Sequence, residues 1–260
     1  LYTRAGTTDH KTRHDGLALL LSNMLSWAGT PHDHEVFNLF RHCFVQPQVD
    51  GVAEARSRGV QGLIPDLKFK PRGEPQEALY DVKCLNPCPT HYGVATERSH
   101  AVKRRELAVH GEYLSKARRA DRKYNLTPLG QGGGALEREL LTYPRVRGLA
   151  FGCYGEASPQ VEEVVQHIAK TEAYKRWEEM GATNAREATA ALVCRSRLYI
   201  GIASVRAFAK LKIDVWRNVV GGDRTQAAAR RRRAQERYWT NQRAYYEHHR
   251  PAAGQRGGRG

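Results

Sequence analysis

The sequence predicts an α/β protein: a central mixed β-sheet flanked by helices, with an α-helical C-terminal extension. Two short apolar runs, one on either side of residues 71–75, predict a β-hairpin because two prolines and a glycine interrupt the pairing between them. Amphipathic helical segments precede and follow this hairpin, and a further apolar strand lies beyond them. An order of helix, strands, helix, strand and helix is typical of a layered α/β domain.

The individual elements are predicted from apolar periodicity and from residues that start or stop helices. Asp15 is expected to cap the first helix. Ser158 and Pro159 suit the cap and the first position of a later helix. The predicted elements are helices over 15–27, 34–43, 98–125, from 159 onward and over 185–220, a strand over 146–154, and a weak strand at 52–55 or near 60 whose register stays open.

Composition divides the chain into three parts. A core over 10–170 contains the predicted sheet, 171–220 is a helical extension, and 221–260 is a basic Arg/Gly-rich tail. The tail has ten arginines against three acidic residues, a net charge of +7, with aromatic residues interleaved. This pattern suits phosphate and base contacts, or alternatively a disordered or nuclear-import tail. Its consecutive arginines, the candidates for nucleic-acid contacts, are Arg230, Arg231, Arg232 and Arg233.

The whole chain is strongly basic. Its formal net charge is +15 and its sequence pI is about 9.8, so a polyanionic partner is expected, nucleic acid first and an anionic membrane second. No apolar run is judged to reach the ~18 residues of a membrane span, so we expect no membrane association. The chain begins with Leu1, and we expect it to be part of a longer protein.

Cysteine usage points to a reducing compartment. The five cysteines are odd in number and scattered, which favours free thiols inside a cell. Cys84, Cys88 and His91 faintly suggest a zinc cluster, but the spacing is unusual and a fourth ligand is missing. A small buried thiol is the simpler interpretation of Cys84.

The predicted hairpin carries acidic residues where core strands are normally apolar. Side chains alternate along a strand, so Asp81 and Lys83 share one face while Val82 lies on the other. Asp66 is on the antiparallel partner strand, about 4.8 Å away in the right register, and its carboxylate can meet that of Asp81. The alternative is a solvated hairpin on which these charges form only a polar surface.

Two carboxylates beside a lysine suit divalent-metal chemistry on phosphodiesters. Mg²⁺ prefers hard oxygen ligands, typically one or two carboxylates plus waters and substrate phosphates. A metal of this kind lowers the pKa of a bound water and offsets charge that grows on phosphorus oxygens. We expect Asp66, Asp81 and the carbonyl of Val82 to hold Mg²⁺ or Mn²⁺, and Lys83 to position the attacking water.

Further cations are predicted on two helices. Lys11, Arg13 and His14 precede the first predicted helix, whose N-terminus favours phosphate. On the helix over 98–125, Lys116 and Lys123 are seven residues apart and lie almost on one line beside the apolar stripe. We expect these lysines to reach DNA phosphates or to support the metal site, although charge runs on helices are often only solvated faces.

Pro65-Asp66, fourteen residues and then Asp81-Val82-Lys83 resemble the PD-(D/E)xK nuclease superfamily. Together with Arg13-His14-Asp15 and a helix ending in Lys123-Tyr124, they resemble the restriction-like endonuclease domain of site-specific non-LTR retrotransposons over about residues 10–170. Asp15 departs from that pattern, in which Asn is usual, and no zinc knuckle is found. The resemblance implies a restriction-endonuclease-like core, and it implies that Arg13, His14, Lys123 and Tyr124 are at the cleavage or DNA-binding site.

The function that the resemblance implies is metal-dependent cleavage of target DNA by a nuclear protein, as one module of a retrotransposon polyprotein that also contains a reverse transcriptase. RNA is a possible second partner of the basic tail. A catalytically inactive nucleic-acid-binding domain on the same scaffold is the first alternative. The second is a repair or recombination nuclease of the same fold, which is expected to prefer branched or damaged DNA.

Overall fold

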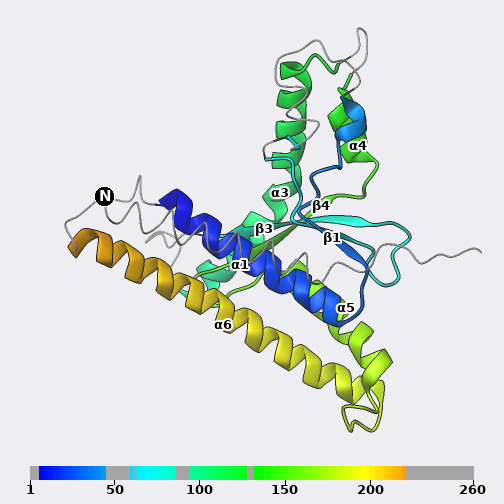
Figure 1. The fold of residues 1–260 in the computed structure, drawn as a ribbon, viewed down its shortest axis with the longest axis vertical. Coiled ribbons are helices and arrows are strands. Elements are labelled where there is room, and N and C mark those ends of the chain that lie inside the picture. The colour runs from blue at the N-terminus through cyan, green and yellow to red at the C-terminus, as the bar shows by residue number, and fades with distance from the viewer. Residues whose placement is uncertain (1–5, 45–58, 61, 86–93, 128–131, 221–260) are drawn as a thin grey trace, which may run out of the picture. The chain divides into compact units, whose positions relative to one another are not determined.

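A computed structural model of the chain describes residues 6–44, 59–60, 62–85, 94–127 and 132–220 (Figure 1). The chain divides into two compact units, Leu1–Lys210 and Leu211–Gly260. The sheet and the candidate site belong to the first unit. The predicted weak strand at 52–55 and the basic tail at 221–260 lie outside the described residues.

The described residues form a four-stranded sheet in the order β1-β2-β3-β4. Its strands are β1 (His32–His34), β2 (Leu67–Phe69), β3 (Ala78–Cys84) and β4 (Val146–Phe151). β2 pairs antiparallel with both β1 and β3, whereas β4 pairs parallel with β3. A parallel pair needs a long crossover connection, and the helix α3 (Ala95–Lys123) supplies it. The prediction of an α/β fold with a mixed sheet is therefore confirmed.

The predicted hairpin is formed by β2 and β3. Leu67 pairs with Tyr80 and Phe69 with Ala78, so the register extended by one residue places Asp66 opposite Asp81. Gly73, in the connection, has a φ of 84°, a conformation that glycine adopts without strain. The predicted antiparallel pairing is therefore confirmed, and the two acidic residues are neighbours at the end of the paired segment.

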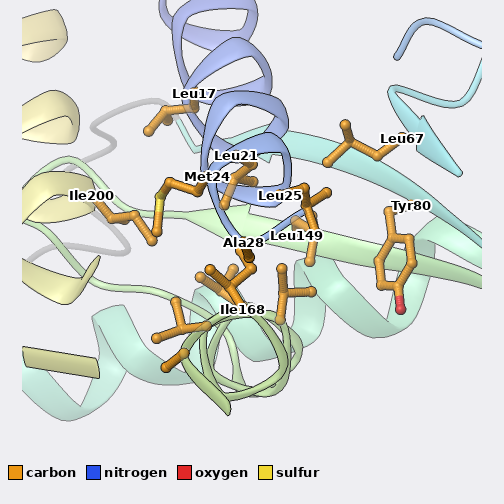
Figure 2. Close-up of a cluster of buried hydrophobic side chains, with 14 of the residues drawn as sticks. Leu17, Leu21, Met24, Leu25, Ala28, Leu67, Tyr80, Leu149, Ile168 and Ile200 are labelled. Carbon is orange, nitrogen blue, oxygen red and sulfur yellow. The ribbon is translucent and has the colours of Figure 1, made fainter. Parts of the chain in front are cut away.

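Helices cover both faces of the sheet, which gives two hydrophobic cores. The first core lies between the sheet and the helices α1 (Gly6–Trp27), α5 (Pro159–Arg176) and α6 (Ala185–Val220); in Figure 2, Leu21, Leu25 and Ile168 pack around Leu149. The second core lies under α3 and the short helix α4 (Ala135–Leu141) and contains Leu79 of β3. The alternation predicted for β3 is thus confirmed: Tyr80, Val82 and Cys84 belong to the first core, and Leu79 to the second.

The close packing of α3 on β4 depends on Gly148. A Cβ atom at this position would lie 2.7 Å from the carbonyl oxygen of Glu106 and 2.8 Å from its Cα. Glu106 is on α3, so the backbone of the helix rests directly on the strand. This contact sets the height of α3 above the sheet, and with it the position of the α3 side chains that reach the candidate site.

Two predicted elements differ from the observed ones, the helix over 34–43 and the start of the first helix. No helix spans 34–43: β1 ends at His34, and a 3₁₀ turn is present only at Arg41–Cys43. The backbone N–H groups of Glu35 and Val36 donate to the carbonyls of Asp66 and Pro65, at 2.8 and 2.9 Å, so this segment pairs with the start of β2. These long-range hydrogen bonds override the apolar period that predicted a helix.

The first helix begins at Gly6, nine residues before the predicted cap at Asp15. Arg13, His14 and Asp15 consequently lie inside α1 and not ahead of its N-terminus. The predicted phosphate site at a helix N-terminus is therefore wrong for this segment. The long helix α3, the strand β4 and the helices α5 and α6 are observed where they were predicted, within a few residues at each end.

Helix α6 contributes Ala188, Leu192, Val193 and Ile200 to the first core, so this part of the predicted extension packs on the sheet domain. In Figure 2, Ile200 of α6 lies beside Met24 of α1. Over Ala185–Lys210 the helix is long and apolar enough, at a mean hydropathy of 1.2, to cross a membrane by length and composition. The expectation that no run reaches that length does not hold for α6, and 33% of the stretch is buried inside the protein.

Candidate active site

Asp66 and Asp81 are both buried at the middle of the sheet. Asp66 comes immediately before β2 and is 7% exposed, and Asp81 is in β3 and is 4% exposed. The backbone N–H of Asp66 donates to the carbonyl of Tyr80 at 2.9 Å, which continues the strand pairing as far as the acidic residue. Buried carboxylates need compensating partners, and each of these two has them.

Asp66 is held from two directions. The backbone N–H of Val82 donates to its Oδ2 at 2.6 Å, and Nε2 of His14 lies 3.2 Å from the same oxygen. The sequence predicted that Val82 serves the site through its carbonyl, and the structure shows a contact of its N–H group. This hydrogen bond orients the Asp66 carboxylate toward β3.

His14 links α1 to the acidic pair. Its Nδ1 lies 3.1 Å from Oδ1 of Asp15, so both ring nitrogens face carboxylates. Burial by itself lowers the pKa of His14, but the hydrogen bonds with Asp15 and Asp66 outweigh burial and raise the pKa to about 10. His14 is therefore an imidazolium at neutral pH, and its charge neutralises part of the acidic cluster.

Asp81 lies between a phenol and an ammonium group. The hydroxyl of Tyr113, on α3, donates to Oδ1 of Asp81 at 2.9 Å, and Nζ of Lys83 forms an ion pair with Oδ2. Burial and the nearby charge of Asp66 raise the pKa of Asp81, whereas Lys83 and Tyr113 act in the opposite direction. Oδ2 of Asp81 has this ion pair but no hydrogen bond of ordinary geometry.

Lys116 of α3 reaches the same site. Its ammonium is half-buried, and burial together with the charge of Lys83 lowers its pKa. A Cβ atom on Gly62, which has a φ of 80°, would lie 3.4 Å from Cδ and Nζ of Lys116, so the lysine side chain passes directly over this glycine. The structure therefore places Lys83 and Lys116 near Asp81, and His14 beside Asp66.

The acidic pair meets the minimum requirement for a hard divalent cation. The two buried carboxylates are close enough for the charge of Asp66 to act on Asp81, and Oδ2 of Asp81 has no partner beyond the Lys83 ammonium. Within the described ranges no group of three or more His, Cys, Asp or Glu residues is arranged to hold a metal ion. Any Mg²⁺ at Asp66 and Asp81 would consequently take its remaining ligands from the backbone, water or a substrate phosphate.

Two predicted nucleic-acid contacts are contradicted by burial. Arg13 is 2% exposed, and its guanidinium donates to backbone carbonyls at the ends of β3 and β4, among them Leu85 at 2.8 Å and Gly152. Tyr124 belongs to the second core, where its ring meets that of Phe44 edge-on at 5.5 Å. Arg13 closes the carboxyl ends of the parallel strands, and Tyr124 anchors the end of α3.

Lys123 is at the exposed end of α3, with its ammonium 5.0 Å from the centre of the Tyr124 ring. It is available to a phosphate, but it is two helical turns from Lys116. The four tail arginines, Arg230–Arg233, lie outside the described residues, as do Cys88 and His91 of the suggested zinc cluster. Cys84 itself is buried and free, as the simpler interpretation predicted.

Tyr113 is the site residue that sequence reasoning missed. Its ring lies on the apolar side of α3 and is buried in the second core. The sequence could have indicated a polar contact for Tyr113, because a buried tyrosine normally needs a hydrogen-bond partner for its hydroxyl. The sequence does not show that this partner is Asp81, because the height of α3 over the sheet depends on Gly148.

A comparison of the chain with protein-family models, with curated proteins and with solved structures found no match. The geometry of the site itself therefore carries the functional argument.

Proposed function

We propose that this protein is a metal-dependent DNA endonuclease that hydrolyses phosphodiester bonds. The observation that carries the proposal is the convergence of Asp66, Asp81 and Lys83 on two neighbouring strands, with each carboxylate buried and oriented. The raised pKa of Asp81 supports the proposal, because buried groups with strongly perturbed pKa values are concentrated at functional sites.

In this proposal Asp66, Asp81 and the carbonyl of Val82 hold Mg²⁺ or Mn²⁺. The cation, when bound, supplies Lewis-acid chemistry: it activates a water and offsets charge on the phosphate. Lys83 holds and orients the water through its ammonium group, and Tyr113 fixes the Asp81 carboxylate. His14 fixes Asp66 and brings a positive charge to the side of the site that faces α1.

DNA is the proposed substrate because cations surround the site. Lys116 lies near Lys83, and burial together with the charge of Lys83 lowers its pKa, so a bound phosphate would stabilise both ammonium groups. Lys123 continues this line toward the end of α3. The net charge of +15 adds a long-range attraction for a polyanion.

More specifically, we propose that the domain has a restriction-endonuclease-like core. It would serve as the DNA-cleaving module of a non-LTR retrotransposon polyprotein in the nucleus. The mixed sheet flanked by helices and the placement of His14 beside Asp66 support it. A repair or recombination nuclease of the same fold is the alternative. A preference for branched or damaged DNA over a defined duplex sequence would favour that alternative.

One observation favours a second candidate, a nucleic-acid-binding domain without catalysis. The protein's own cations already neutralise the acidic pair, since His14 contacts Asp66 and Lys83 contacts Asp81. A scaffold that has lost its metal would keep such ion pairs and bind DNA through its basic surface alone. Metal-dependent cleavage separates the two candidates.

The test is a plasmid-nicking assay with Mg²⁺ or Mn²⁺, performed on the whole chain and on Asp81→Asn. Asp33→Asn is the matched control, because Asp33 is an exposed acidic residue of β1 on the same sheet. We expect cleavage by the wild type and by Asp33→Asn, and a loss of at least about a hundredfold in Asp81→Asn. DNA binding measured in EDTA should be equal in all three proteins.

Cleavage that persists at the wild-type rate in Asp81→Asn would show that another site or a contaminant is responsible. Binding by all three proteins with no cleavage under either metal would support the non-catalytic domain. Circular dichroism and thermal unfolding of each variant establish that loss of activity is not loss of fold.

A further inference from the structure

Helix α6 exposes an apolar stripe on the side opposite its buried face. Leu198, Ile202 and Val205 are 59%, 39% and 48% exposed, and they follow one another at spacings of four and three residues. The buried face of the same helix, which includes Leu192 and Ile200, belongs to the first core. The exposed residues, called the α6 stripe below, therefore do not contribute to the fold of the described domain.

The spacing of the α6 stripe is that of a helix–helix seam. Alternating steps of four and three residues keep apolar side chains in line along a helix and are suited to knobs-into-holes packing against a second helix. The stripe is narrow, because the exposed positions next to it include arginines such as Arg195 and Arg206. A flat bilayer surface generally requires a wider apolar face than this one.

The charges beside the stripe have a single sign. From Ala188 to Ile213 every charged residue of the α6 sequence is basic: Arg195, Arg197, Arg206, Lys210 and Lys212. Glu172 of α5 binds Arg195 at 2.8 Å, and Glu162 of α5 binds Arg197 at 2.7 Å, so those two are partly neutralised. Arg206 and Lys210 are exposed one turn apart at the C-terminal end of the stripe.

We propose that the α6 stripe is the docking surface for an acidic amphipathic helix of a partner protein. Leucine and isoleucine side chains of the partner would cover Leu198, Ile202 and Val205, and its glutamates or aspartates would face Arg206 and Lys210. Pairing with a second copy of α6 is disfavoured, because it would bring basic flanks together. This inference is independent of the proposed nuclease activity.

The test uses synthetic peptides, since their sequence can be chosen to match the inference. The probe is a three-heptad helical peptide with leucine at the seam positions and glutamate at the flanking positions. One control peptide has lysine in place of each glutamate, and another has the acidic composition in scrambled order. Binding of each labelled peptide to the whole chain is measured by fluorescence anisotropy at physiological salt.

We expect the acidic peptide to bind at least about tenfold more tightly than either control peptide. The double variant Leu198→Gln and Ile202→Gln should weaken that binding at least about tenfold, since it removes the apolar contact. Leu141→Gln, which changes an equally exposed leucine on α4, should have no effect. Arg206→Glu should reduce the preference for the acidic over the lysine peptide without changing the fold.

The proposal is overturned if the acidic peptide binds the double variant as tightly as the wild type, or if the scrambled peptide binds equally well. It is also overturned if the chain forms a dimer in analytical ultracentrifugation that the double variant abolishes, because a second copy would then be the occupant. Flotation with phosphatidylcholine–phosphatidylserine vesicles that depends on Leu198 and Ile202 would identify a bilayer instead. Thermal unfolding confirms that the variants are folded.

Discussion

At the residue scale, the site depends on hydroxyl and imidazole groups whose partners lie far away in sequence. The Tyr113 hydroxyl has one proton and faces two acceptors, Oδ1 of Asp81 at 2.9 Å and the carbonyl of Ile64 at 3.1 Å. Burial and the nearby negative charge of Asp81 raise the pKa of Tyr113 well above its ordinary value, so the phenol keeps its proton. Tyr113 therefore ties α3 to the segment that leads into β2 as well as to the acidic pair.

Replacing Tyr113 with phenylalanine should lower the free energy of unfolding by about 1–3 kcal/mol, because the buried Asp81 oxygen loses its donor. Urea unfolding measures this change. Tyr174→Phe is the matched control: Tyr174 is 71% exposed, and loss of its hydroxyl should change the stability by less than about 0.5 kcal/mol. Equal effects of the two substitutions would show that the hydrogen bond to Asp81 does not contribute to stability.

His167 makes stability depend on pH in the acid range. Its Nδ1 accepts a hydrogen bond from the backbone N–H of Arg72 at 3.1 Å, and burial together with the charge of Arg72 lowers its pKa below 6.5. The unfolded chain therefore binds the His167 proton more readily than the folded chain does. The contribution of His167 is complete above about pH 6.5, and it is lost as the pH falls from there toward the folded-state pKa.

The free energy of unfolding should thus decrease between about pH 7 and about pH 5, and the decrease should be smaller in His167→Gln. Urea unfolding at the two pH values measures it, and an NMR titration of the ring reports the lowered pKa directly. A variant that shows the same decrease as the wild type would contradict this role of His167.

At the element scale, the decisive contact is that of α3 with β4. Gly148→Ala should destabilise the protein by about 1–3 kcal/mol, because the new methyl group meets the helix backbone at Glu106 and not a flexible side-chain end. Gly111→Ala is the control substitution. Gly111 is on α3, and no atom lies within 4 Å of the position that a Cβ atom would take there. Alanine there should stabilise the protein by about 0.5–1 kcal/mol.

Chemical denaturation measures the change in the free energy of unfolding for each substitution. A decrease for Gly148→Ala and an increase for Gly111→Ala would confirm that the backbone of α3 rests on β4. If Gly148→Ala were neutral, α3 would have to lie higher above the sheet, and the reach of Tyr113 and Lys116 to Asp81 would have to be reconsidered.

At the scale of the whole molecule, the charge of +15 makes DNA binding depend on salt. Each phosphate neutralised by a lysine or arginine contributes about 0.9 to the slope of log K against log salt. Lys123→Ala should therefore reduce the slope by about 0.9, measured in EDTA so that cleavage does not interfere. Lys170→Ala is the control for a general loss of charge, because Lys170 is an exposed lysine on α5. An equal reduction of the slope in this variant would argue against a DNA-binding surface along α3.

Much of the fold could be predicted because its signals are local. The hairpin follows from prolines and glycine between two short apolar runs, and α3, α5 and α6 follow from apolar periodicity. Asp66 and Asp81 could be paired because a short connection leaves few registers, and strand alternation then determines the face on which Asp81 lies. The helix α4 was missed, because the residue that caps it, Asp121, is on α3 and accepts from the N–H groups of Leu136 and Glu137 at 2.9 and 3.0 Å.

The sequence by itself determined that the chain is basic, that its sheet is mixed and flanked by helices, and that two acidic residues and a lysine lie on adjacent strands. Only the tertiary structure decided the side chains around them: Arg13 and Tyr124 turn inward, while His14 and Tyr113 join the acidic pair. The physical reason is that local backbone preferences act over a few residues. The partner of a buried charge or hydroxyl is instead chosen by whichever distant element packs against it.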